Sequence, residues 1–299
     1  MNLEHLHTEK RNPNTMDIDT VSSLEICRMM NREDLTVADA VTGVLPDIAR
    51  LINTGAASLR KKGRIFYAGS GSSGRLGVMD ASEIPPTFSI EHGQFNGIIA
   101  GGDEALRDAA PLFEDDELAG RKALIPHRIA EHDLVIGLTA SGRTPFVRGA
   151  LLYAQKQGAA TALICCNKGA ELSPLADIAV EIDTGPEAIT GSTRLKAGTA
   201  QKMVLNMFST GTMIRMGKVY SNLMVSLNPT NEKLVARAVR IIQEATGVPL
   251  PEAEKAFEKT ADPQTAIVHL LTGATPEEAK QALRAHEGNI RKAVNQLIK

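Results

Sequence analysis

Three serines lie close together in the glycine-rich stretch GSGSSG, residues 69–74, between a short apolar run and a helical pattern. The first backbone amides of a helix have no partner within the helix, so a loop that leads into a helix can bind an anion. The hydroxyl groups of Ser70, Ser72 and Ser73 can each donate a hydrogen bond to a phosphate oxygen, and Gly71 lets the backbone approach closely. The stretch therefore predicts a phosphate-binding site.

A lone carboxylate, Glu83, follows at the end of the helix that we expect over residues 73–82. We expect Ile84, Pro85 and Pro86 to bury it, and burial of a carboxyl group disfavours its charged form. A carboxyl group that is protonated near neutral pH can act first as a general acid and then as a general base. The two features together predict acid–base chemistry on a phosphorylated ligand.

Two further hydroxyl-rich loops, TASGRT (139–144) and TGSTRLKAG (190–198), each follow an apolar run. One such loop is usually only a helix N-cap, but three after strands of one sheet predict a shared site for a phosphate monoester. We expect these two loops to contribute Thr139, Ser141, Gly142, Thr144, Ser192 and Lys196. Nearby cations are equally typical of surface charge or of contacts to the phosphate or a second anionic group: Arg75, Arg143, Arg194 and Lys196.

The elements that must position these loops are short apolar runs separated by helical patterns. Strands are predicted at 65–68, 95–100, 134–139, 162–166 and 178–182, and helices at 73–82, 104–118, 144–157 and 196–220. Continuous apolar strands that alternate with helices predict an α/β three-layer sandwich with a five-stranded parallel sheet. Such sheets bind ligands beyond the carboxyl ends of their strands, which is where all three loops fall.

Outside this region the chain reads as helical. Residues 1–62 combine an extended polar arm (1–16) with helices over 18–30 and from about 36, residues 63–246 form the sheet domain, and residues 247–299 follow the boundary at Gly247-Val248-Pro249. The last segment resembles a ubiquitin-associated (UBA) three-helix fold, with a helix-capping sequence at Thr275. We interpret it as a module that supports packing or dimerisation.

The composition excludes several functional classes. The 299 residues carry a net charge of −2, only 3% are aromatic and none is Trp, which argues against nucleic-acid binding. The polar N-terminus and the lack of an 18-residue apolar run argue against export and membrane insertion, and three cysteines without CxxC spacing are typical of free thiols in the cytoplasm. None of the seven histidines has metal-ligand spacing, so no metal is expected.

Nucleotide binding is a weaker interpretation. Gly69, Gly71 and Gly74 satisfy the dinucleotide pattern G-x-G-x-x-G, but that pattern also needs an acidic residue at the end of the second strand, and Asp103 comes late. The P-loop pattern fails because no Lys-Ser/Thr pair follows the glycines.

The motifs GSGSSGR and TASGRT resemble the phosphosugar-binding motifs of the sugar isomerase (SIS) family, a flavodoxin-like fold. Within it, GSGSSGRLGVMDASEIPPTFS and TGSTRLKAGTAQKMVLNMFSTGTMIRMGKVYSNLMV resemble the bacterial N-acetylmuramic acid 6-phosphate etherases. The resemblance implies a homodimer with its active site near the subunit interface and a small phosphosugar as substrate. It implies cleavage of the D-lactyl ether to N-acetylglucosamine 6-phosphate and D-lactate, without a cofactor, in the recycling of cell-wall amino sugars.

The resemblance also implies a second catalytic carboxylate, Glu114, beside Glu83. From the residues alone, Glu114 belongs to an acidic run (114–117) that is typical of a solvated helix face. Two carboxyl groups suffice for elimination of lactate followed by addition of water. Two alternatives stay open: a phosphosugar aldose–ketose isomerase, and a non-catalytic phosphosugar sensor such as the similar glucokinase regulatory protein.

Overall fold

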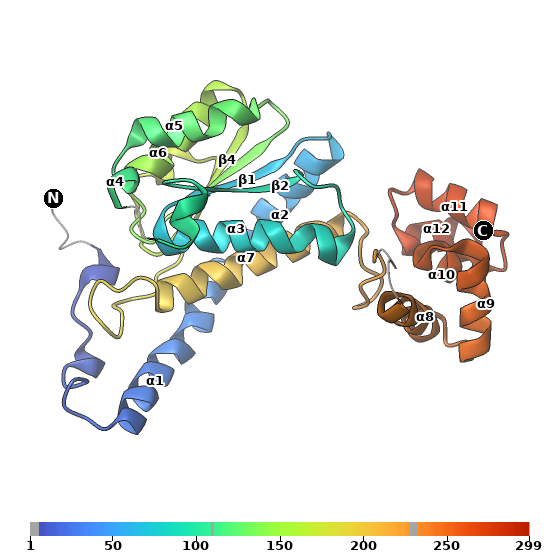
Figure 1. Ribbon diagram of the computed structural model, residues 1–299, viewed down its shortest axis with the longest axis horizontal. Coiled ribbons are helices and arrows are strands. Elements are labelled where there is room, and N and C mark those ends of the chain that lie inside the picture. Colours follow the sequence, from blue (N-terminus) through green and yellow to red (C-terminus); the bar gives the residue numbers. More distant parts are fainter. Residues whose placement is uncertain (1–5, 109–110, 228–231, 299) are drawn as a thin grey trace. The chain divides into compact units, whose positions relative to one another are not determined.

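The computed structural model describes residues 6–108, 111–227 and 232–298, and its centre is a five-stranded parallel sheet (Figure 1). The strand order is β2-β1-β3-β4-β5, with every neighbouring pair parallel. This order and the layers around it confirm the predicted flavodoxin-like α/β sandwich. The strands are β1 (Ile65–Gly69), β2 (Phe95–Ile99), β3 (Leu134–Leu138), β4 (Ala160–Cys165) and β5 (Ile178–Glu181).

Helices cover both faces of this sheet, as its continuous apolar strands require. Figure 1 shows α5 (Glu117–Leu124) and α6 (Pro145–Lys156) over one face, and α3 (Gly71–Phe88) and α7 (Lys196–Arg215) over the other. Successive residues of β1 contact the helices on opposite faces of the sheet. Phe66 and Ala68 pack with Phe146 of α6, whereas the ring of Tyr67 lies 6.1 Å from the ring of Phe208 in α7. The centre of the sheet is therefore dry on both sides.

Two glycines allow α5 and α6 to approach very closely. A Cβ atom built on Gly120 of α5 would overlap the carbonyl oxygen of Phe146, and one built on Gly149 of α6 would overlap the carbonyl oxygen of Glu117. Any side chain at either position would therefore push the two helices apart. Because α6 begins directly after Thr144 and α5 begins shortly after Glu114, this packing fixes the spacing of two predicted site residues.

Several helix boundaries differ from those predicted. The N-terminal helices are α1 (Ser23–Thr42) and α2 (Leu45–Arg60), so the chain breaks near Gly43 and not between residues 30 and 36. Pro46 explains the break, because proline fits the first turn of α2 but cannot continue a preceding helix. The helix predicted over 104–118 is instead three short pieces, η3 (Asp103–Leu106), α4 (Pro111–Glu114) and α5.

The chain divides into two compact units, residues 1–82 with 93–209 and residues 83–92 with 210–299. The first unit includes α2, which packs on β1, β3 and β5, so residues 1–62 do not stand apart from the sheet. The expected N-terminal arm is also ordered from residue 6: Asn167 accepts a hydrogen bond from the His7 amide at 2.8 Å and donates one to the Thr8 hydroxyl at 3.1 Å.

The second unit is helical and has its own core. Its helices are α8 (Glu232–Thr246), α9 (Leu250–Thr260), α10 (Pro263–Thr272), α11 (Pro276–Ala285) and α12 (Ile290–Leu297). The expected boundary at residue 247 does not separate the units, because Ala238 and Ile242 of α8 share one core with Ala253 and Ala266. Four helices rather than three follow residue 247, and Thr275 forms the predicted capping box at the start of α11.

Candidate active site

A small polar pocket lies at the carboxyl edge of the sheet, within the first unit. Its volume is about 200 Å³, and we call it the hydroxyl pocket because most of its lining side chains are hydroxyls. They come from all three predicted loops: Ser70, Ser72, Ser73, Thr139, Ser141, Thr144 and Thr193. Gly71, Ala140, Glu9 and Glu114 complete the lining. The structure thus brings together the loops that the sequence predicted to share one site.

The first loop is a tight connection between β1 and α3. Gly71 takes a positive φ of 50°, a conformation that favours glycine, and α3 begins at this residue. Ser70 and Ser73 are buried, whereas Ser72 is exposed. The helix amides and the three hydroxyls therefore lie at the same end of α3, where a phosphate is favoured by both hydrogen bonding and the helix dipole.

Ser73 is held by a residue that the sequence did not single out. Its hydroxyl donates to Oε1 of Gln201 on α7 at 2.8 Å, and Gln201 is buried. The amide nitrogen of Gln201 has no partner among the described residues. Since the two ends of a glutamine amide can exchange places, rotation would make Nε2 the donor to Ser73 and release the hydroxyl proton for a ligand.

The second loop is organised around Thr139. Its Oγ1 lies 2.8 Å from Oγ1 of Thr144 and 3.3 Å from Oγ of Ser141, and it accepts a hydrogen bond from the Gly142 amide at 3.2 Å. Gly142 shapes the loop with a positive φ of 76° but does not line the pocket. This hydroxyl network fixes three side chains at the start of α6, so little side-chain freedom is lost on ligand binding.

The third loop places two predicted residues away from the pocket. Thr193 lines it, but its neighbour Ser192 does not. Lys196 is buried, and its ammonium group lies 2.6 Å from the carboxylate of Glu33 on α1, which also accepts from Asn14. Although burial raises the pKa of Glu33, the hydrogen bonds from Lys196 and Asn14 hold it below its ordinary value. Lys196 therefore joins α1 to α7 and does not line the hydroxyl pocket, so its role as a substrate ligand stays a prediction.

A buried polar cluster lies behind the pocket, between the sheet and two helices. The Tyr67 hydroxyl donates to Asp80 of α3 at 2.7 Å, and the Ser209 hydroxyl of α7 donates to the other carboxylate oxygen at 3.0 Å. Burial raises the pKa of Asp80 to about 6 in spite of these hydrogen bonds. The cluster ties α3 to α7, and sequence patterns did not reveal it because the hydrogen-bonded partners Asp80 and Ser209 lie 129 positions apart.

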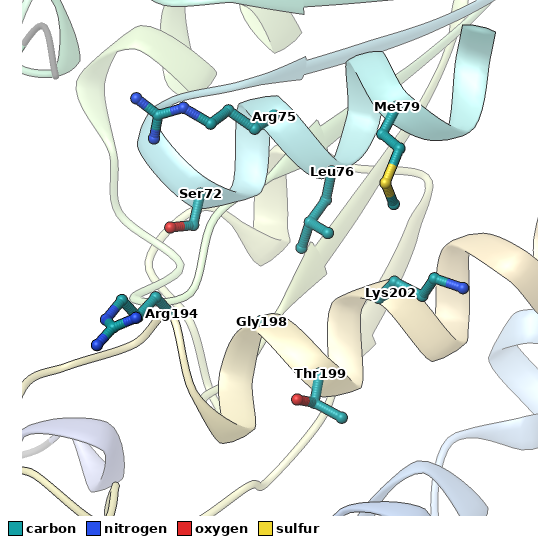
Figure 2. Close-up of a pocket in the computed structure, with 8 residues that line it drawn as sticks. All are labelled: Ser72, Arg75, Leu76, Met79, Arg194, Gly198, Thr199 and Lys202. Atoms are coloured by element: carbon teal, nitrogen blue, oxygen red, sulfur yellow. The ribbon is translucent and has the colours of Figure 1, made fainter. Parts of the chain in front are cut away.

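A second, larger pocket adjoins the first one. It has a volume of about 400 Å³ and lies between α3 and the start of α7; we call it the cationic groove (Figure 2). Ser72 lines both pockets. The groove is also lined by Leu76 and Met79 of α3, by Arg194, Gly198, Thr199 and Lys202, and by Arg75. Within the described residues it contains no acidic side chain, whereas the hydroxyl pocket contains no basic one.

Known proteins match the chain over nearly its whole length. Residues 47–155 match the N-terminal SIS domain of glucokinase regulatory protein, and residues 117–211 match the SIS domain. The N-acetylmuramic acid 6-phosphate etherases of Salmonella agona (strain SL483) and Salmonella typhi are each 50% identical over 295 residues, which is 98% of this chain and 99% of the relative. The chain belongs to the N-acetylmuramic acid 6-phosphate etherase family.

Solved structures share the fold of this chain. A Bacteroides fragilis protein described as a phosphosugar isomerase involved in capsule formation is 16% identical to this chain, with a TM-score of 0.50. The match covers 67% of this chain and 95% of that one. Within the described ranges of this chain, no helix combines the length and hydropathy needed to cross a bilayer, and no group of three potential metal ligands occurs.

Glu114, one of the two carboxylates implied by the family, lines the hydroxyl pocket from the end of α4 and is half-buried. Its acidic neighbours have other contacts. Asp116 caps α5 by accepting from the Ala119 amide at 3.0 Å, and Glu117 forms an ion pair with Arg148 at 2.6 Å. The acidic run is therefore not simply a solvated face. The pocket also contains Glu9 from the N-terminal turn, which sequence reasoning missed because it treated residues 1–16 as an arm.

Glu83, the other carboxylate, differs from its prediction. It is exposed, although Ile84 and Pro85 beside it are buried, so the adjacent apolar residues do not bury it. It also lies twelve residues after Gly71 in the continuous helix α3, which corresponds to about 18 Å along the helix axis. Phosphorus and C3 of a hexose 6-phosphate are joined by five bonds of about 1.5 Å and are thus at most about 7 Å apart. Along this one helix, C3 of a sugar bound at the start of α3 would thus not reach Glu83, and the catalytic role of Glu83 stays a prediction.

Proposed function

We propose that this protein cleaves the D-lactyl ether of N-acetylmuramic acid 6-phosphate, giving N-acetylglucosamine 6-phosphate and D-lactate. The observation that carries the proposal is 50% identity over 98% of the chain to curated etherases. The hydroxyl pocket adds physical support, because seven hydroxyl side chains and two helix N-termini form a site suited to a phosphate monoester. The reaction fits the cytoplasmic recycling of cell-wall amino sugars, and the buried free thiols of Cys165 and Cys166 are typical of a reducing compartment.

The reaction proceeds by elimination and then hydration. In the ring-opened sugar the C2 proton is acidified by the neighbouring aldehyde at C1, and the lactyl oxygen sits on C3. A base takes the C2 proton, the C2–H electron pair forms the C2–C3 double bond, and the C3–O bond breaks as an acid protonates the departing lactate oxygen. Water then adds to C3 while a proton returns to C2. One carboxyl group that first gives and later takes a proton can serve both the leaving group and the water.

The two carboxyl groups come from different subunits of a homodimer. Glu114 lies in the same pocket as the phosphate-binding hydroxyls, whereas Glu83 is about 18 Å along α3 from the start of that helix. A two-fold axis beside α3 would place Glu83 of the partner subunit at the sugar of the first, and would cover a side chain that is exposed in the single chain. Burial in that interface would supply the protonated state that a general acid requires. The helical second unit supports the dimer.

The reaction is tested with purified protein and N-acetylmuramic acid 6-phosphate in H₂¹⁸O. We expect D-lactate together with a product that carries the label at C3, and we expect Glu83→Ala to abolish release while the sugar phosphate still binds. Absence of D-lactate, with interconversion of phosphosugars or binding alone, would identify an isomerase or a sensor instead. Lactate with the label elsewhere would contradict the elimination and hydration route.

The shared site is tested by mixing Glu83→Ala and Glu114→Ala chains after reversible dissociation. In a heterodimer with shared sites, one site combines intact Glu114 and intact Glu83 and the other lacks both. Random mixing should then restore about a quarter of the wild-type activity, because half of the dimers are mixed and each has one intact site. If both carboxyl groups came from one chain, no mixed site would be intact and activity would stay at the level of the separate variants.

A further inference from the structure

The two adjoining pockets differ sharply in charge. The hydroxyl pocket contains two carboxylates, Glu9 and Glu114, and among the described residues no lysine or arginine lines it. The cationic groove has the opposite character, with Arg75, Arg194 and Lys202 along its walls. A ligand with two anionic groups would therefore meet hydroxyl groups and helix amides at one end and cationic side chains at the other.

The cations of the groove are not equally available. Arg75 donates from Nε to the Leu106 carbonyl at 3.1 Å, and Figure 2 shows its guanidinium directed away from α7. Lys202 extends along α7, and it favours the charged form of the buried Asp80. Arg194 is exposed, lies next to Thr193 of the hydroxyl pocket, and has no ion pair within the ranges that the structure describes. Arg194 is thus the cation best placed to meet a ligand that spans both pockets.

The groove also offers an apolar surface. Figure 2 shows the side chains of Leu76 and Met79 directed from α3 toward α7, on the same side as the Ser72 hydroxyl. Ser72 and Met79 are seven residues apart in α3, or about 10 Å along the axis. In the proposed substrate, eight bonds of about 1.5 Å join phosphorus to the lactyl carboxyl carbon, so those two atoms can be up to about 10 Å apart. The lactyl group carries one methyl and one carboxylate, which match an apolar wall beside a cation.

We propose that the cationic groove binds the D-lactyl group of the substrate, with Arg194 bound to its carboxylate and Leu76 and Met79 packed against its methyl group. This inference rests on the proposed function. It assigns the specificity for lactyl ethers to the cationic groove and not to the pocket that binds the phosphate. The phosphate stays in the hydroxyl pocket, and Ser72 lies where the two parts of the substrate meet. Arg194 therefore distinguishes the substrate from its own sugar product, which has the phosphate but no carboxylate.

The proposal is tested by binding in a Glu83→Ala background, in which no turnover is needed. Dissociation constants for N-acetylmuramic acid 6-phosphate and for N-acetylglucosamine 6-phosphate are measured by calorimetry, with and without Arg194→Gln. Loss of a hydrogen bond to a charged group should weaken binding of the lactyl sugar roughly 10- to 100-fold. Binding of the lactyl-free sugar should change by less than about twofold, as for an ordinary surface substitution. Arg194→Lys should recover part of the loss.

Lys156→Gln is the matched control, because it removes an exposed cation from the last turn of α6, at the opposite end of that helix from Thr144. It should leave both constants unchanged. Equal weakening of both sugars by Arg194→Gln would show that Arg194 binds the phosphate, and no weakening of either would show that it binds neither group; each result overturns the proposal. Failure of the proposed function would appear separately, as absence of D-lactate from the wild-type protein while these binding constants remain measurable.

Discussion

Two helix N-termini of this protein present backbone amides that have no partner within the helix, but the two ends are used differently. At α7, the amides of Lys196 and Ala197 donate to the carboxylate of Glu187 at 2.8 and 3.0 Å, and Glu187 is fully buried. At α3, the amides face the hydroxyl pocket, where the side chains of the same loop are the neutral hydroxyls of Ser70, Ser72 and Ser73 and the carboxylates of Glu9 and Glu114 belong to other segments. The start of α7 is occupied by a carboxylate of the protein itself, which we call the internal anion. The start of α3 is suited to a ligand anion that binds reversibly.

The difference shows how one chain can use the amides of one helix for stability and those of another helix for ligand binding. The carboxylate at α7 is accompanied by a buried ion pair, Lys196 with Glu33, so α1, α7 and the loop before α7 form one charged assembly. At α3 no carboxylate among the described residues is hydrogen-bonded to the first amides, although Glu9 and Glu114 line the same pocket, and hydroxyl groups can either donate or accept. Neutral groups are suited to reversible binding, because no buried side-chain charge is left unpaired when the ligand departs.

The strongest test of this comparison removes the internal anion. Glu187→Ala would leave two buried amides without partners, and each unsatisfied group destabilises the folded state by about 1–3 kcal/mol. We expect a loss of about 2–5 kcal/mol in the free energy of unfolding, measured by urea denaturation of the full chain. Glu187→Gln keeps an acceptor and should lose clearly less. An alanine variant as stable as the wild type would mean that the amides of α7 do not need this carboxylate.

The matching test at α3 measures binding, because the hydroxyl groups there face the hydroxyl pocket. Ser73→Ala removes a hydroxyl that faces the phosphate, and we expect affinity for N-acetylglucosamine 6-phosphate to fall about 10-fold, or 1.4 kcal/mol. Gln201→Glu should weaken binding similarly, because a carboxylate can only accept the Ser73 proton. Ser23→Ala, at an exposed serine in the first turn of α1, is the control and should bind normally. Unchanged affinity in both site variants would remove Ser73 from the phosphate site.

The smallest expected effect is a pH dependence confined to the internal anion. Burial raises the pKa of Glu187 above its ordinary value of 4.5, although the two amides act in the opposite direction. A carboxyl group whose pKa is raised in the folded state contributes stability at low pH and loses it as pH rises through the folded pKa. The wild type should therefore lose stability relative to Glu187→Gln as pH rises above the ordinary value. Parallel unfolding curves for the two proteins across that range would contradict the raised pKa.

Local sequence patterns were sufficient to predict the strands of the sheet and the three hydroxyl-rich loops at its edge. Each strand is a short apolar run, each loop carries its own glycines and hydroxyls, and a parallel sheet brings the carboxyl ends of its strands to one edge. The positions of Ser70, Ser73, Thr139 and Thr144 in one pocket follow from this rule alone.

The side-chain placements that the sequence did not reveal depend on partners far away in the chain. Lys196 follows a hydroxyl-rich loop, but its position was decided by Glu33, 163 residues away, and Ser73 is held by Gln201, 128 residues away. Such pairs leave no periodic signal in the sequence. Glu83 shows a different limit: its apolar neighbours predicted burial, yet on a helix adjacent residues point in different directions.

The contact between α5 and α6 makes the site sensitive to changes far from it. Gly120 and Gly149 touch no ligand, yet each leaves no room for even a methyl group. An added side chain at either position would shift Glu114 and Thr144 relative to each other, since these residues stand at the starts of the two packed segments. In evolutionary terms, the geometry of the pocket is sensitive to mutation at two positions that do not line it.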